Sequence, residues 1–134
     1  MKKSTLLFFT VLILGIAAKA QSPATYFPAK WNIGTSVLRS CSGKFTLIYQ
    51  NDGNLVLYKN TNKPIWATMT NGKSSNLLTF QTDGNLVIYN YNNPIWGAQC
   101  HNKGGRYIIL QDDGNLVVYT ADNRPIWASD TGGL

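Results

Sequence analysis

The sequence predicts an all-β protein built from three similar units, and three observations support this fold class. A nine-residue segment occurs three times, at shifts of 31 and 30 residues. Apolar side chains around each copy alternate with a period of two, which is the period of a strand. Each copy also contains Asp-Gly, a strong short-range signal for a β-hairpin. After residue 20, no stretch shows the 3.6-residue period of a helix.

The repeated segment keeps the same five residue types at alternate positions in all three copies. They are Gln50, Asp52, Asn54, Val56 and Tyr58; Gln81, Asp83, Asn85, Val87 and Tyr89; and Gln111, Asp113, Asn115, Val117 and Tyr119. A short polar segment after each copy leads to Pro-Ile-Trp, at residues 64–66, 94–96 and 125–127. The constant order of motif and tripeptide indicates a repeating unit rather than a chance match.

Each unit is expected to form three strands. In the first unit, Leu47 and Tyr49 alternate with their neighbours up to the Gln, and the chain turns at Asp-Gly. Leu55 and Leu57 then share one face of the next strand, while the Asn, Val and Tyr of the motif share the other. The third strand carries Pro-Ile-Trp, with Pro at its first position, where the missing N–H is tolerated.

The three units should pack together, because a single three-stranded unit cannot bury its apolar face alone. Three similar sheets around a common axis make a prism. Residues 26–43 lack the motif but contain Trp31, Ile33, Val37 and Leu38, and are expected to add a strand that completes one sheet. The tail, residues 129–134, is expected to do the same for a neighbouring sheet.

The first 20 residues have the three parts of a secretory signal peptide. Lys2 and Lys3 precede an apolar run over 6–18, and Ala18-Lys19-Ala20 offers small residues for cleavage after Ala20. The run is shorter than the ~18 residues that cross a bilayer, which argues against the competing interpretation as a membrane anchor. We therefore expect a signal peptide at 1–20, an N-terminal linker at 21–30 and one domain at 31–134. The protein would be secreted, or periplasmic in a bacterium, with no membrane span.

Charge and composition argue against catalysis and against nucleic-acid binding. Three of the 12 basic residues lie in the leader, and the nine that remain face six aspartates without forming a basic stripe. The sequence has no Glu and one His, so acid–base and zinc chemistry are poorly supplied. Asp112 and Asp113 are adjacent but would face opposite ways on a strand, unlike the paired carboxylates of a glycosidase. We expect no enzyme activity, no metal and no cofactor.

The two cysteines, Cys41 and Cys100, allow only one pairing. In an oxidising compartment an even count favours a disulfide, provided that the two Cα atoms approach within about 7 Å. The alternative is two separate, half-buried thiols.

The repeated polar residues are the part of the motif that the fold does not require, and they therefore point to function. Packing and turns account for repeated Leu, Gly and Trp, but not for Gln, Asp, Asn and Tyr at fixed steps of two. One interpretation is structural: Asp and Asn hold the turn while Gln and Tyr face solvent. The other is a sugar pocket, in which carboxylate, carboxamide and phenol groups meet the hydroxyl rim of a pyranose and Val meets its C–H face. Such a pocket would select sugars by hydroxyl geometry.

The motif Gln-x-Asp-x-Asn-x-Val-x-Tyr, complete in all three copies, resembles the signature of the bulb-type, monocot mannose-binding lectins over residues 31–133. The resemblance implies a β-prism of the second type, with three antiparallel four-stranded sheets about a pseudo-threefold axis. It implies metal-free binding of α-D-mannose, with mannose-containing glycans or glycoproteins as partners. Asp and Asn would hold the axial 2-hydroxyl, Gln the 3-hydroxyl and Tyr the 4-hydroxyl, with Val against the ring carbons. It also places Trp66, Trp96 and Trp127 near the axis, in agreement with core packing rather than sugar stacking.

Two features depart from that family. Its familiar plant members carry a cysteine where Gly53 stands here, paired with one just before the second motif, so this chain implies a different disulfide or none. The family often dimerises by exchanging C-terminal strands, whereas this chain ends soon after Trp127, which leaves a homodimer open. The alternative function is that of a bacterial lectin-like toxin or adhesin, whose sites bind a surface polysaccharide such as a rhamnose-containing glycan.

Overall fold

The computed structural model describes residues 24–134, and its regular elements are twelve β-strands in three antiparallel four-stranded sheets. Sheet I consists of β3 (Thr35–Arg39), β4 (Phe45–Tyr49), β5 (Leu55–Lys59) and β6 (Lys63–Ala67). Sheet II consists of β2 (Ala29–Asn32), β7 (Leu77–Phe80), β8 (Leu86–Asn90) and β9 (Asn93–Gly97). Sheet III consists of β1 (Thr25–Tyr26), β10 (Gly105–Leu110), β11 (Leu116–Thr120) and β12 (Pro125–Ala128).

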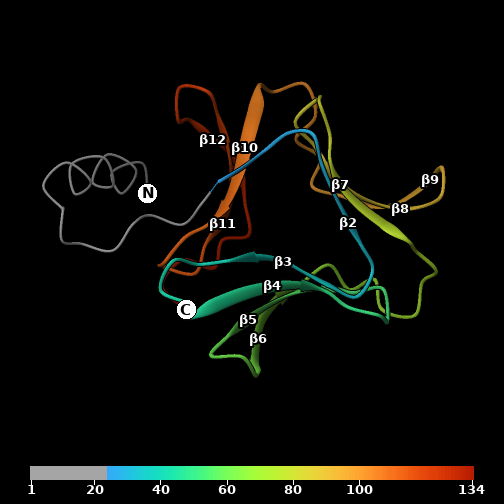
Figure 1. Ribbon diagram of the computed structural model, residues 1–134. Helices are drawn as coiled ribbons and strands as arrows, with labels where there is room; N and C mark the ends of the chain where they lie inside the picture. Colours follow the sequence, from blue (N-terminus) through green and yellow to red (C-terminus); the bar gives the residue numbers. More distant parts are fainter. Residues whose placement is uncertain (1–23) are drawn as a thin grey trace, which may run out of the picture.

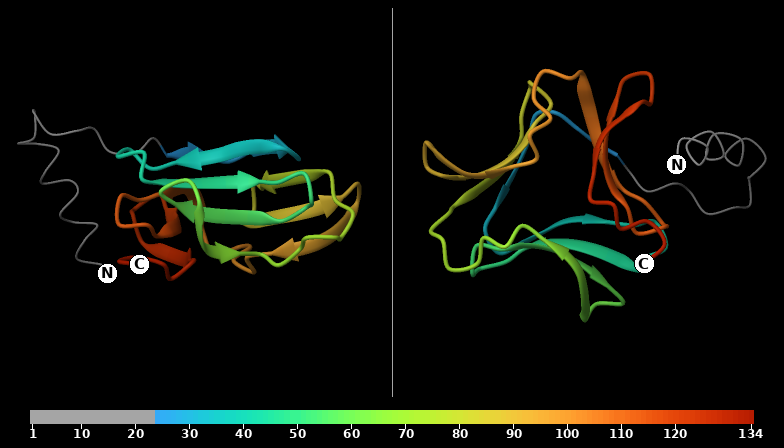
Figure 2. Two further views of the ribbon diagram at one scale, coloured as in Figure 1. Left: turned by 90° about the horizontal axis from the view of Figure 1, so that it is seen from below. Right: turned by 180° about the vertical axis from the view of Figure 1, so that it is seen from behind.

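The three sheets stand around one axis as the sides of a triangular prism, which confirms the predicted fold (Figure 1; Figure 2, right). The expected signal peptide at 1–20 lies outside the described residues. Within residues 24–134, the structure holds no helix with the length and hydrophobicity that a bilayer crossing requires.

The repeated motif turns the chain as the sequence predicts. In sheet I, the backbone N–H of Gly53 donates to the carbonyl of Gln50 at 2.9 Å, and that of Gln50 donates to the carbonyl of Asn54 at 2.9 Å. Gly53 has φ +91°, a conformation that costs glycine little because it has no Cβ. The loop is therefore a type I turn followed by a left-handed residue, the common three-residue hairpin connection.

The N-terminal segment differs from expectation. Instead of one strand over 26–43, the chain forms three short strands, and each pairs with the first strand of a different repeat. Figure 2 (left) shows the blue and cyan strands along one end of the prism. Within the linker expected at 21–30, Thr25–Tyr26 and the first residues of β2 thus belong to the sheets. Each pairing covers an edge that a three-stranded sheet would leave open.

The C-terminal tail also differs from expectation, because residues 129–134 form no strand. Its backbone groups bond the third repeat instead: the N–H of Ser129 donates to Leu116 at 2.9 Å, and that of Gly133 donates to Asp113 at 2.8 Å. The tail corresponds to the segments that follow β6 and β9, which make equivalent bonds to the first and second repeats.

The inner faces of the three sheets form one core. Aliphatic side chains of the central strands, including Leu57, Ile88 and Val118, have no exposed surface. At the axis, Trp66, Trp96 and Trp127 pack edge to face, with ring centroids 5.9, 5.9 and 6.3 Å apart. This confirms the core role expected for these tryptophans.

Gly84 lies close to the backbone of a neighbouring sheet, so its replacement should be costly. A Cβ at this position would lie 2.9 Å from the backbone nitrogen of Gly105, and the residue has φ +85°. Gly72 has a similar φ of +83° but nothing within 4 Å of the added atom. We expect Gly84→Ala to lower the free energy of unfolding by about 2 to 3 kcal/mol and Gly72→Ala by about 1 kcal/mol. Equal losses in urea denaturation would contradict the close contact.

Candidate functional site

Each repeat gathers its five predicted residues at one hairpin of its sheet, where the Gln, Asp and Tyr side chains are joined by hydrogen bonds. We call these clusters site I (Gln50, Asp52, Asn54, Val56, Tyr58), site II (Gln81, Asp83, Asn85, Val87, Tyr89) and site III (Gln111, Asp113, Asn115, Val117, Tyr119). In site I, Gln50 Nε2 donates to the two carboxylate oxygens of Asp52 at 3.2 and 3.3 Å, and the Tyr58 hydroxyl donates to Gln50 Oε1. Sites II and III repeat both interactions.

The aspartate has a turn role as well. In all three sites its Oδ1 accepts the backbone N–H of the following Asn at 2.9 Å. The structural interpretation of the motif is therefore correct for Asp. It does not account for the Gln side chain, which lies just after the first strand of the unit and donates to the carboxylate, or for the Tyr on the next strand, which donates to the Gln.

The asparagine is oriented by a second segment of chain. Asn54 Oδ1 accepts the backbone N–H of Thr70 at 3.1 Å and the hydroxyl of Thr68 at 3.2 Å. Asn85 and Asn115 are held in the same way by the segments after β9 and β12. Because the amide oxygen is engaged inside the protein, the Nδ2 group is the end that can donate to a ligand.

The residues that hold the asparagines were missed by sequence reasoning, although a signal exists. They come from the positions two and four residues after each Pro-Ile-Trp tryptophan, which hold Thr68 and Thr70, Ala98 and Cys100, and Ser129 and Thr131. In the second repeat Cys100 alone bonds the asparagine, because Ala98 has no side-chain donor. Between the two positions, Met69, Gln99 and Asp130 all have φ near +60°. Small residues recur two and four positions after the Trp of each Pro-Ile-Trp, and this recurrence was the signal that they belong to the repeating unit.

The expected disulfide between Cys41 and Cys100 is not formed. Cys100 occupies the position that Thr70 and Thr131 hold in the other repeats, and its buried thiol donates to the carbonyl of Gly84 at 3.4 Å. Burial raises the pKa of this thiol. Cys41 lies in the turn between β3 and β4, where the next residue, Ser42, bonds the Asp112 carboxylate of the third repeat. The two cysteines serve different repeats, so their even number was a misleading signal.

Cys100→Thr should preserve or slightly raise stability. Thr70 and Thr131 already make the corresponding bond, from their hydroxyls to the carbonyls of Gly53 and Gly114 at 2.6 Å. We expect the free energy of unfolding to change by less than about 1 kcal/mol, whereas Cys100→Val, which cannot donate, should cost about 1 to 3 kcal/mol. Denaturant titration of both variants tests this. A Thr variant less stable than the Val variant would contradict the equivalence of the three positions.

The chemistry of each site suits a polyhydroxylated ligand. A carboxylate, two carboxamides and a phenol provide both acceptors and donors. A buried valine stands between the Asn and the Tyr of each motif, with Val56, Val87 and Val117 at most 5% exposed. Among the described residues, no group of three His, Cys, Asp or Glu side chains is arranged to hold a metal ion.

Site III differs from the other two because a tyrosine covers it. Tyr107 on β10 stacks on Tyr119 with ring centroids 5.3 Å apart, and Tyr26 of β1 packs against its other side at 5.5 Å. The positions that pair with the motif Tyr in sheets I and II hold Thr46 and Leu77. Gln111 and Tyr119 are each only 3% exposed, whereas their counterparts in sites I and II are half-buried. Burial and the two neighbouring tyrosines raise the pKa of Tyr107 to about 12.

A three-sheet prism that carries one such polar cluster per sheet defines the class of bulb-type lectins. No protein-family profile matches the sequence. The chain is 41% identical over 91 residues to the mannose-specific lectin of Galanthus nivalis, a match that covers 67% of this chain and 57% of that protein. Its match to the mannose-specific lectin of Narcissus pseudonarcissus, at 51% identity over 49 residues, covers 36% of this chain and 44% of that protein. The chain thus spans about half the length of these curated relatives.

Two solved structures are similar over nearly their whole length. A monomeric monocot mannose-binding lectin from Gastrodia elata is 42% identical, with a TM-score of 0.74, covering 83% of this chain and 99% of that chain. The snowdrop (Galanthus nivalis) agglutinin complexed with methyl-α-D-mannoside is also 42% identical, with a TM-score of 0.65, covering 81% of this chain and 95% of that chain. The chain belongs to the monocot mannose-binding lectin family.

Proposed function

We propose that this protein is an exported lectin that binds α-D-mannose at its motif clusters, without a metal ion. The observation that carries the proposal is the same chain of hydrogen bonds from Tyr to Gln to Asp in all three sheets, in which the Gln and Tyr side chains have no part in the turn. The mannoside complex of a 42% identical relative supports the choice of sugar. Export rests on the leader at 1–20, and the mature chain would begin at Gln21.

Each side chain has a role in this proposal. Asp52, Asp83 and Asp113 accept from the axial 2-hydroxyl, to which the Asn Nδ2 groups donate. The Gln carboxamides bond the 3-hydroxyl and the Tyr hydroxyls the 4-hydroxyl, while the valines contact the ring carbons. The polar groups bond one another in the ligand-free protein, so they are already oriented when the sugar arrives, which lowers the entropic cost of binding.

Calorimetric titration with two epimers tests the proposal. Methyl α-mannoside should bind with a dissociation constant of about 1 mM, typical of a shallow site for one sugar ring. Methyl α-glucoside, which differs only at the 2-hydroxyl, should bind much more weakly, because the Asp and Asn groups would be left without a partner. No heat with mannoside, from protein whose circular dichroism shows a folded β structure, would overturn the proposal. A rhamnoside that binds while mannoside does not would support the alternative of a toxin or adhesin.

Site III is expected to bind more weakly than sites I and II, because Tyr107 covers Tyr119 and because Gln111 is buried. Tyr107→Thr introduces the residue that sheet I carries at this position and should strengthen mannoside binding at site III several-fold. Calorimetry on a protein that carries Asp52→Asn and Asp83→Asn, in which site III is the intact site, measures the mannoside affinity of site III directly. The same background without the Tyr107 change is the control, and equal affinities in the two proteins would contradict the covering role.

A further inference from the structure

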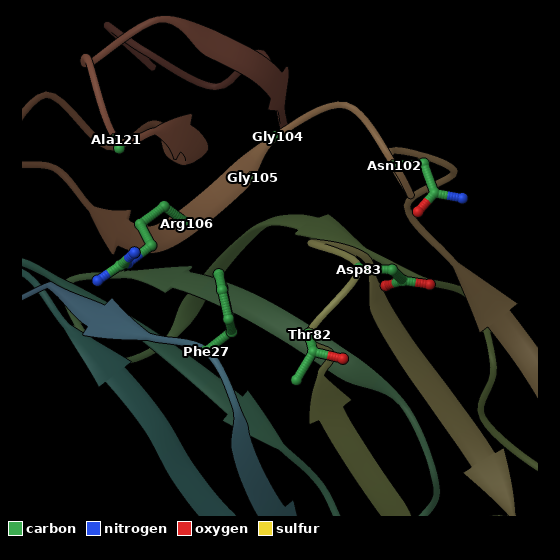
Figure 3. A pocket seen from close by; sticks show the side chains of 8 residues that line it. All are labelled: Phe27, Thr82, Asp83, Asn102, Gly104, Gly105, Arg106 and Ala121. Carbon is green, nitrogen blue, oxygen red and sulfur yellow. The ribbon is translucent and has the colours of Figure 1, made fainter.

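A groove of about 410 Å³ opens beside site II, between sheets II and III. Figure 3 shows the Asp83 carboxylate and Thr82 on one side of it, Arg106 on the other, and the Phe27 ring between them. This volume is within the range of pockets that hold small organic ligands. The groove therefore continues from a residue of the proposed mannose site onto a surface that the motif does not include.

The sequence at this corner of the prism differs from that at the corner beside site I. At the corresponding corner beside site I, the Ser75 hydroxyl bonds the Tyr49 hydroxyl at 2.7 Å. Six residues before Gln111, the position of Ser75 is taken by Gly105, and the position of Tyr49 is taken by Phe80. Phe27 packs edge to face on Phe80, with ring centroids 6.3 Å apart, and provides an apolar wall.

Arg106 brings a fixed positive charge to the groove. Its guanidinium lies over the rings of Phe27 and Tyr26, at 5.5 and 5.7 Å from their centroids. The N–H groups of the guanidinium are donors that a carboxylate or a phosphate can accept from. The equivalent position before site II holds the neutral Asn76, which makes Arg106 specific to this corner.

We propose that this groove is a subsite for a second sugar ring, joined to the mannose in site II, and that Arg106 selects a ring with an acidic group. The ring packs its C–H face on Phe27, and its carboxylate or phosphate accepts from the guanidinium. The proposal rests on the proposed function, since the first ring is the mannose held by Asp83. Site II would then recognise an acidic glycan, whereas site I would recognise mannose alone.

Calorimetry on the Asp52→Asn, Asp113→Asn background, which leaves site II intact, tests the proposal with three ligands. They are methyl α-mannoside, a mannosyl-glucose disaccharide, and the mannosyl-glucuronic acid disaccharide of the same linkage. The acidic disaccharide should bind about tenfold more tightly than the neutral one, as a charge-assisted hydrogen bond allows, and the gain should shrink at high salt. A mannosyl-glucose 6-phosphate of the same linkage shows whether phosphate is accepted as well as carboxylate.

Matched variants assign the gain to the groove. Arg106→Gln should remove it and leave methyl α-mannoside affinity unchanged, whereas Arg124→Gln, an exposed arginine outside the groove, should retain it. Ala121→Trp, which fills the groove while Arg106 stays, should also remove it. Equal affinities for the two disaccharides, or a gain that survives Arg106→Gln in a folded protein, would overturn the proposal. Absence of methyl α-mannoside binding would instead overturn the proposed function.

Discussion

The protein with asparagine at positions 52, 83 and 113 is expected to lose detectable mannoside binding while it keeps its fold. Each aspartate receives two donor contacts from its Gln, and the 2-hydroxyl would be a third donor. In the variant, the amide Nδ2 replaces the carboxylate Oδ2, so a donor faces the Gln Nε2 group and the sugar 2-hydroxyl, which are themselves donors. The change also removes the negative charge of the acceptor. The loss should be about 10- to 100-fold at each site, which takes a millimolar site beyond measurement.

Asparagine is the informative replacement because it preserves the turn. Its Oδ1 can still accept the backbone N–H that Asp accepts at 2.9 Å in all three repeats, whereas alanine would also remove that bond. The control is Asp122→Asn, which changes an exposed carboxylate outside the sites. Calorimetry and circular dichroism should show a folded triple variant without binding. Unchanged mannoside affinity in that variant would mean that the aspartates serve only the turn.

Trp96→Ala is expected to lower the free energy of unfolding by about 3 to 5 kcal/mol, the range for a core tryptophan. Trp96 contacts both of the other axial tryptophans, with ring centroids 5.9 and 6.3 Å away, so its removal leaves a cavity where the three sheets meet. Guanidinium denaturation measures the loss.

The same variant separates core packing from sugar stacking. Trp96→Phe keeps a ring at the axis and should cost less than the alanine change. At a temperature where Trp96→Ala is fully folded, its mannoside affinity should equal that of the unmodified protein, because Trp96 packs against the inner core. Full stability with lost binding would contradict the core assignment.

The three hairpins and the axial tryptophans were predictable because their signals are local. The period of two, Asp-Gly and Pro-Ile-Trp each recur within a unit, so one interpretation applies three times. The fourth strand of each sheet was not predictable in this way. Thr25–Tyr26 has only two residues, and β1 and β2 pair with repeats far along the chain, whereas β3 pairs with the neighbouring β4. Which edge each strand covers depends on packing between units rather than on local sequence.

The candidate sites were predictable in their members but not in their surroundings. The motif identified all fifteen residues that the structure gathers into three clusters. The cover over site III depends on Tyr107 lying opposite Tyr119, which is known only once the strand register is known. Cys100 was misread for a related reason: its chemistry suggested pairing, whereas its position in the repeat makes it a substitute for threonine.

The central claim is that the motif side chains themselves contact the sugar. The most direct measurement is a titration with methyl α-mannoside that follows the side-chain amide signals in nitrogen–proton correlation spectra. The signals of Gln50 and Gln81 and of Asn54 and Asn85 should shift in a saturable way, with one dissociation constant near the calorimetric value. If the signals of these four amides do not shift while other signals shift and saturate, the sugar binds elsewhere and the motif side chains do not contact it.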